Sequence, residues 1–97
     1  MKYGLTLQQL DLIFTSIKKF PEIKKVILFG SRAMGNYKPG SDIDLMIMGS
    51  QLTPLTITRL SGCLNEEASL PFSFDIVGEP LSADLKAHIE EHGVVFF

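Results

Sequence analysis

The sequence predicts an α+β domain in which a mixed sheet of three or four strands carries helices mainly on one face. The first observation is the order of its elements, which runs helix, strand, turn, strand, helix, strand, helix. The second is the unequal length of the connections, which favours a mixed sheet. The third is composition: 97 residues, of which 45% are hydrophobic and 21% charged, are typical of a single globular domain, here residues 1–97.

The N-terminal elements are predicted from their boundary residues. Thr6 and Gln9 have the spacing of a capping box, and apolar residues recur on one face of the helix that follows until Pro21 ends it. The apolar run 26–29 is predicted to be a buried strand, and 31–34 a single helical turn. The remaining elements, each bounded by a glycine, a proline or a capping residue, are a strand at 42–48, a helix at 55–68, a strand at 72–77, a helix from Ser82 to Gly93 and a short edge strand at 94–97.

Charge and cysteine content exclude several classes of function. Nine Lys and Arg against eleven Asp and Glu give a net charge of −2, which disfavours nucleic-acid binding through a basic face. Cys63 is the single cysteine, so an internal disulfide and a cysteine-cluster metal site are excluded. No apolar run approaches the roughly 20 residues that cross a bilayer, and no signal-like core follows the N-terminus. We therefore expect a cytoplasmic protein without membrane contact.

The segment from Gly30 to Asp44 carries the chemistry. A strand runs into Gly30-Ser31 and a helical turn follows, so backbone N–H groups and a hydroxyl are available to an anion. Asp42 and Asp44 alternate along the next strand, which places both carboxylates on one face, about 6.6–6.8 Å apart at Cα. Asp75 lies in another apolar strand, where aspartate is depleted.

Three carboxylates on neighbouring strands need a compensating charge. Mg²⁺ prefers oxygen ligands and is commonly held by one or two carboxylates together with substrate phosphates. The carboxylates and the anion-binding turn, without a histidine or cysteine nucleophile beside them, indicate phosphoryl or nucleotidyl transfer with two metal ions. His88 and His92 have a spacing that can bind a metal, but no third ligand accompanies them, so we interpret both as part of a solvated helix end.

Nearly the whole chain resembles the minimal nucleotidyltransferases of the DNA polymerase beta superfamily. The resemblance rests on Gly30-Ser31, on Asp42 and Asp44, and on Asp75. Further similarity to the small members is found at residues 3–6, 20–21, 28–33 and 81–95. It implies the nucleotidyltransferase fold.

The resemblance also assigns roles to individual residues. Asp42, Asp44 and Asp75 correspond to the catalytic metal ligands, which hold two Mg²⁺ ions in the family's reaction. Asp75 also corresponds to the carboxylate that deprotonates or orients the attacking hydroxyl. Gly30 and Ser31 correspond to the turn that binds the nucleotide phosphates. Arg32 follows this turn and is expected to reach the triphosphate, although an exposed or structural arginine is an equal alternative.

Small members of this family are typically encoded beside a HEPN (higher eukaryotes and prokaryotes nucleotide-binding) protein. The resemblance implies an antitoxin that transfers AMP from ATP to a tyrosine of a HEPN ribonuclease toxin. The alternatives are an antitoxin that acts by binding and occlusion only, and nucleotidyl transfer to a small molecule or to RNA. Association into a homo- or hetero-oligomer is left open.

Overall fold

A four-stranded mixed sheet forms the centre of the molecule, whose computed structural model describes residues 2–97. The strands are β1 (Lys25–Phe29), β2 (Ile43–Met48), β3 (Phe74–Val77) and β4 (Val94–Val95), in the order β3-β2-β1-β4. β1 pairs antiparallel with both β2 and β4, whereas β2 and β3 are parallel. The sheet is therefore mixed, as the unequal connections predict.

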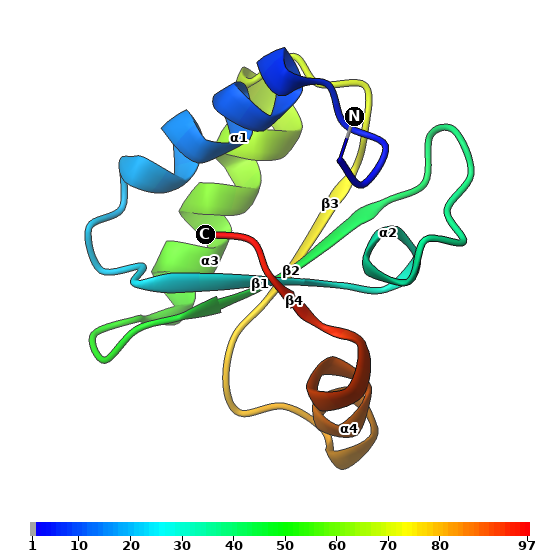
Figure 1. Ribbon diagram of the computed structural model, residues 1–97. Helices are drawn as coiled ribbons and strands as arrows, with labels where there is room; N and C mark the ends of the chain where they lie inside the picture. Colours follow the sequence, from blue (N-terminus) through cyan, green and yellow to red (C-terminus); the bar gives the residue numbers. More distant parts are fainter. Residues whose placement is uncertain (1) are drawn as a thin grey trace.

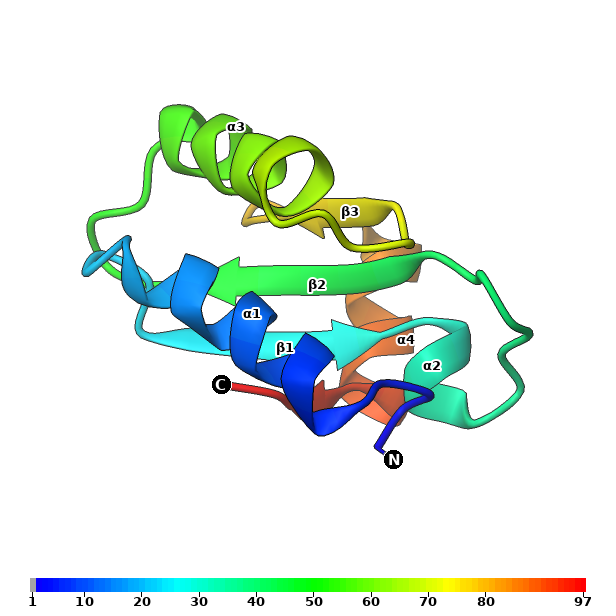
Figure 2. The same ribbon diagram turned by 90° about the horizontal axis from the view of Figure 1, so that it is seen from above.

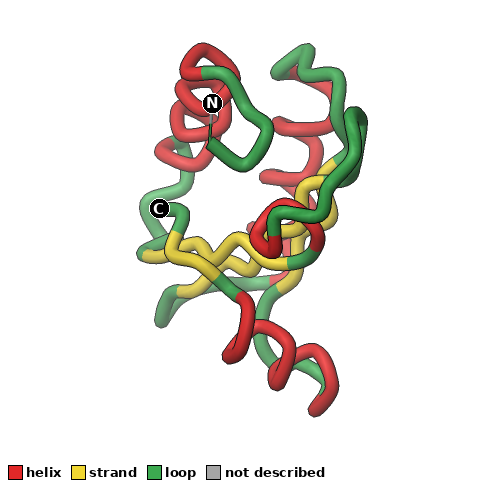
Figure 3. Tube along the Cα trace, turned by 45° about the vertical axis from the view of Figure 1, so that its right-hand side comes forward, coloured by secondary structure: helices red, strands yellow, loops and turns green. Residues whose placement is uncertain are grey.

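The helices divide unevenly between the two faces of the sheet (Figures 1 and 2). α1 (Leu7–Lys18) and α3 (Pro54–Gly62) cover one face, and α4 (Ala83–His92) lies on the other. The tube in Figure 3 shows the same division, with the strands between the two groups of helices. The one-turn helix α2 (Ser31–Met34) follows the end of β1. No helix in residues 2–97 is long and apolar enough to cross a membrane.

The core lies between the sheet and the first group of helices. Alternate residues of β2 point into it, and Ile43, Leu45 and Ile47 are completely buried. They are joined by Val26 and Leu28 of β1. The helices contribute Leu10, Ile13, Ile17, Leu60 and Leu64. Because the alternation of β2 places its apolar residues in this core, Asp44 and Met46 belong to the opposite face, which α4 covers only in part.

The element boundaries agree with the sequence in most places. Thr6 and Gln9 form the predicted capping box, with reciprocal hydrogen bonds of 3.1 and 2.9 Å. The prediction of one α-helix at 55–68 is wrong in its second half. The α-helix α3 ends at Gly62, and the chain continues as the π-helix η1 (Cys63–Glu67). Likewise, β3 begins at Phe74, two residues later than predicted. Asn65 of η1 contacts the first residue of β3, Phe74: its side chain accepts from the Phe74 N–H at 2.7 Å and donates to the Phe74 carbonyl at 3.2 Å.

Candidate functional site

Adjacent strands bring the three predicted aspartates to one region of the partly covered face. Asp44 of β2 and Asp75 of β3 are partners in the parallel register. Their chain neighbours Ile43 and Ile76 are buried in the core, so both carboxylates point away from it. Asp42 immediately precedes β2 and is exposed, as is Asp75, whereas Asp44 is half-buried. The structure thus brings the three residues to the same end of the β2–β3 pair.

The neighbouring acids affect the pKa of Asp44. The pKa of Asp44 is raised, first by burial and then by the negative charges of Asp75 and Asp42, while His88 acts in the opposite direction. Within residues 2–97, no Lys or Arg forms an ion pair with any of the three. The cluster therefore concentrates negative charge that no Lys or Arg of residues 2–97 neutralises through an ion pair.

The donors of this cluster suit a hard divalent cation. All three are carboxylates, which match the oxygen preference of Mg²⁺, and two of them are fixed on paired strands. Among the described residues, no group of three or more His, Cys, Asp or Glu side chains is drawn together closely enough to hold a metal ion as it stands. The fit to Mg²⁺ therefore rests on donor type, strand placement and the concentration of negative charge.

The Gly30-Ser31 turn lies directly beside Asp44. Gly30 has φ 76° and ψ −157°, a combination that only glycine adopts readily. A Cβ at this position would overlap Oδ2 of Asp44. The absent side chain therefore allows the turn and the carboxylate to pack together, and it places the two predicted parts of the site in contact.

The helical turn after Gly30 leaves donors free. The Met34 N–H donates to the Gly30 carbonyl at 3.1 Å and closes the turn. The first N–H groups of a helix have no acceptor within it, and nothing in residues 2–97 accepts from the N–H of Ser31. Ser31, half-buried beside the acidic cluster, thus offers a free N–H and a hydroxyl to an anion.

Arg32 points into the protein, and its contacts are structural. Only 2% of its surface is exposed. Nε and Nη2 donate to the Ser41 carbonyl at 3.1 and 2.8 Å, and Nη1 donates to the Tyr3 carbonyl at 2.8 Å. The guanidinium also lies 4.5 Å from the centre of the Phe72 ring. Burial lowers the pKa of Arg32, against the charges of Tyr37 and Asp42. These contacts favour the structural alternative, and contact with the nucleotide stays a prediction.

His88 is a site residue that sequence reasoning missed. It is half-buried, and its Nε2 accepts a hydrogen bond of 3.2 Å from the N–H of Gly30. Its ring meets Phe29 edge-on, with centroids 6.1 Å apart. The interpretation of His88 as a solvated helix end is therefore wrong. Gly30 and His88 are 58 positions apart, and no local signal shows that α4 packs across β1.

Comparison with known protein families identifies the family to which this chain belongs. Residues 12–97 match the family described as polymerase beta, nucleotidyltransferase. The chain belongs to this family. No curated protein sequence matches this nucleotidyltransferase domain.

Solved structures show the same fold at low sequence identity. A toxin–antitoxin structure with AMP-PNP is 22% identical, with a TM-score of 0.74 over 91% of this domain and 72% of that chain. A MntA–HepT toxin–antitoxin structure is 19% identical, with a TM-score of 0.69 over 95% and 72%. A third holds a tri-AMPylated Shewanella oneidensis HEPN toxin in complex with MNT antitoxin; the match is 21% identical, with a TM-score of 0.62 over 91% and 71%.

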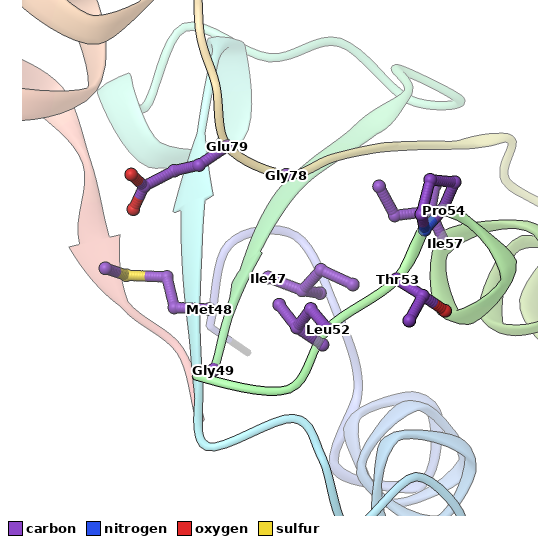
Figure 4. Close-up of a pocket in the computed structure, with 9 residues that line it drawn as sticks. All are labelled: Ile47, Met48, Gly49, Leu52, Thr53, Pro54, Ile57, Gly78 and Glu79. Carbon is purple, nitrogen blue, oxygen red and sulfur yellow. The ribbon is translucent and has the colours of Figure 1, made fainter.

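Two hollows of this nucleotidyltransferase domain differ in their relation to the aspartates. A hollow of about 280 Å³ lies at the far end of β2, between Gly49, Pro54 and Glu79 (Figure 4), and none of the aspartates lines it. Another, of about 520 Å³, lies between the sheet and α4. Met46, one of the residues lining it, shares the face of β2 with Asp44. The second hollow thus opens on the same face of the sheet as Asp44, although none of the three aspartates lines it either.

Proposed function

We propose that this nucleotidyltransferase transfers AMP from ATP to a hydroxyl of a partner protein in a Mg²⁺-dependent reaction. The observation that carries the proposal is the cluster of Asp42, Asp44 and Asp75 against the Gly30-Ser31 turn. The partner we propose is a HEPN toxin, which makes the chain an antitoxin. Similar folds in complexes with AMP-PNP and with a tri-AMPylated HEPN toxin support this choice of nucleotide and partner.

The aspartates and Ser31 would have different roles in this reaction. Asp42, Asp44 and Asp75 would hold Mg²⁺, which when bound screens the charge of the triphosphate and acidifies a hydroxyl. The N–H and hydroxyl of Ser31 would bind oxygens of the β- and γ-phosphates. Asp75, exposed on edge strand β3, would orient the acceptor hydroxyl and draw its proton. The acceptor oxygen bonds to the α-phosphorus, the bond from that phosphorus to the bridging oxygen breaks, and pyrophosphate leaves.

The hollow between the sheet and α4 is the proposed place for the nucleoside. It shares the aspartate face through Met46, and its lining combines apolar side chains such as Ile27 and Met48 with the charged side chains of Lys25, Lys86, Glu79 and Glu90. Ligand pockets are typically apolar with a few polar groups that fix orientation. A nucleoside there would lie on the same face as a triphosphate held at Ser31.

The test is transfer of labelled AMP. We expect the full chain, with Mg²⁺, ATP labelled at the α-phosphate and a HEPN protein encoded beside it, to label that protein. Asp44→Asn should reduce the rate at least about a hundredfold, because a metal-bound carboxylate contributes several kcal/mol to transition-state stabilisation. Asp11→Asn is the matched control: Asp11 is exposed on α1, across the sheet from the cluster.

Each alternative has its own outcome in the same assay. If the chain neutralises the toxin without labelling it, and Asp44→Asn neutralises equally well, occlusion accounts for the antitoxin. If label appears only on RNA or on an added small molecule, the reaction class stands and the protein acceptor is wrong. No label on any acceptor, with no affinity for AMP-PNP, would overturn the proposal.

A further inference from the structure

A side chain of the last helix forms a hydrogen bond with the backbone of the proposed phosphate turn. His88 of α4 accepts from the backbone N–H of Gly30, with 3.2 Å between Nε2 and N. A neutral imidazole accepts at Nε2 only when its proton is on Nδ1. The bond fixes one peptide group of the turn, and it joins residues that the chain places far apart.

The C-terminal end of α4, beyond His88, contacts β1, although no residue of the helix is fully buried. Gly93 ends the helix and donates its N–H to the Ile89 carbonyl at 2.8 Å. A Cβ at Gly93 would come within 2.7 Å of Cγ2 of Ile27 in β1. Together with the edge-on contact between His88 and Phe29, the contact at Gly93 brings the imidazole to the end of β1, beside the turn.

Gly30 is therefore held from two sides. The carboxylate of Asp44 packs where a Cβ would be, and His88 holds the N–H. The adjoining donors of Ser31 remain free among the described residues. A glycine is conformationally permissive, so contacts on both sides are what select one conformation of this turn.

We propose that His88 is a positioning residue of the phosphate site. Its Nε2 fixes the Gly30 peptide and so aims the donors of Ser31 at the phosphates of the nucleotide. His88 acts through Gly30 and touches no reacting atom. The inference rests on the proposed function in one respect, that the ligand of the turn is a nucleotide triphosphate.

Three substitutions separate the hydrogen bond from the packing. His88→Phe keeps an aromatic ring against Phe29 but has no acceptor, whereas His88→Asn is polar and ends one bond short of Gly30. His88→Gln places a carbonyl oxygen the same number of bonds from Cα as Nε2. His92→Phe is the matched control, since the His92 ring packs 5.2 Å from that of His88 and makes no hydrogen bond to the turn.

Two measurements on the full chain decide the proposal: the Kd for Mg²⁺ and AMP-PNP by calorimetry, and the exchange rate of the Gly30 amide by NMR. We expect His88→Phe and His88→Asn to bind about five- to tenfold more weakly, as for the loss of one hydrogen bond, and to exchange the Gly30 amide faster. His88→Gln should recover most of the affinity, and His92→Phe should bind like the wild type.

Other results would overturn the assignment in distinguishable ways. Unchanged affinity in folded His88→Phe or His88→Asn would make His88 a packing residue only. Tighter binding would show that His88 competes with phosphate for the Gly30 N–H. Wild-type protein that binds no AMP-PNP while its Gly30 amide is protected would overturn the nucleotide ligand, and with it both the proposed function and this role.

Discussion

At Gly30 the backbone conformation and the carboxylate of Asp44 impose the same requirement. With φ 76° and ψ −157°, a non-glycine residue is strained by about 1–3 kcal/mol, and its Cβ would also overlap Asp44. We expect Gly30→Ala to lower the melting temperature and to abolish measurable binding of Mg²⁺ and AMP-PNP, because Asp44 must move. Differential scanning fluorimetry and calorimetry measure the two effects.

Gly35 supplies the matched control for Gly30. Its φ is also positive, 81°, but a Cβ there would meet no atom within 4 Å. Gly35→Ala should therefore cost only the strain of a left-handed residue, about 1 kcal/mol, and leave nucleotide affinity unchanged. Equal loss of affinity in both variants would mean that backbone strain, and not the contact with Asp44, is responsible.

Arg32 offers a second test at the residue scale. A structural role predicts a loss of stability on substitution, whereas a nucleotide-binding role predicts a loss of affinity. Lysine cannot reproduce the fork that donates to both the Ser41 and Tyr3 carbonyls. We expect Arg32→Lys to destabilise the fold by about 1–3 kcal/mol, which is roughly 4–8 °C in Tm for each kcal/mol. Arg59→Lys makes the same change at an exposed position of α3 and should leave the stability unchanged. A variant with wild-type Tm and weaker AMP-PNP binding would restore Arg32 as a nucleotide ligand.

At the scale of elements, Asn65 takes the place of a further strand at the edge of the sheet. Its side chain pairs with both backbone groups of Phe74, next to Asp75. We expect Asn65→Ala to destabilise the fold by about 1–3 kcal/mol, because the N–H of Phe74 is left in a half-buried place without its acceptor. Glu66→Ala, one position along the π-helix and exposed, is the control. Urea unfolding compares the two, and equal midpoints would show that the edge needs no such partner.

The elements also show which parts of the structure a sequence can predict. Local rules were sufficient for the capping box at Thr6, the helical turn after Gly30 and the alternation that turns Asp44 away from the core, since each depends on residues a few positions apart. The hydrogen bonds of Asn65 with Phe74 and of His88 with Gly30, in contrast, join residues nine and 58 positions apart. No periodicity reports such contacts.

Arg32 and Asp75 show the same limit within the site. Arginine after a glycine–serine turn is compatible with a phosphate ligand and with a structural residue, and only the position of the Ser41 and Tyr3 carbonyls distinguishes the two. Asp75 joins Asp44 because β3 pairs parallel with β2 in a particular register. A shift of that register by one residue would have turned Asp75 into the core.

At the scale of the whole molecule, the acidic cluster makes stability depend on pH. The folded-state pKa of Asp44 is raised by burial, Asp75 and Asp42, above an unfolded value of about 3.9. The folded state therefore binds more protons than the unfolded state between these two values. The resulting stabilisation is complete below the unfolded pKa and is lost as pH rises through the folded pKa. The pKa of Glu22 is lowered by its own backbone N–H and by Thr56, so its contribution to the stability of the fold increases as pH rises.

A comparison of wild type with Asp44→Asn isolates the contribution of Asp44, because Glu22 is common to both. In EDTA and without nucleotide, we expect the variant to become progressively more stable relative to wild type as pH rises from the unfolded to the folded pKa of Asp44. At pH 7 the variant should be at least as stable as wild type. Mg²⁺ with AMP-PNP at 100 times its Kd should then stabilise wild type by roughly 2.7 kcal/mol and the variant far less. Urea unfolding at a series of pH values measures both. A variant that is less stable than wild type throughout, in EDTA, would show that the Asp44 carboxylate is a structural hydrogen-bond acceptor, and the cluster would lose its main physical support as a cation site.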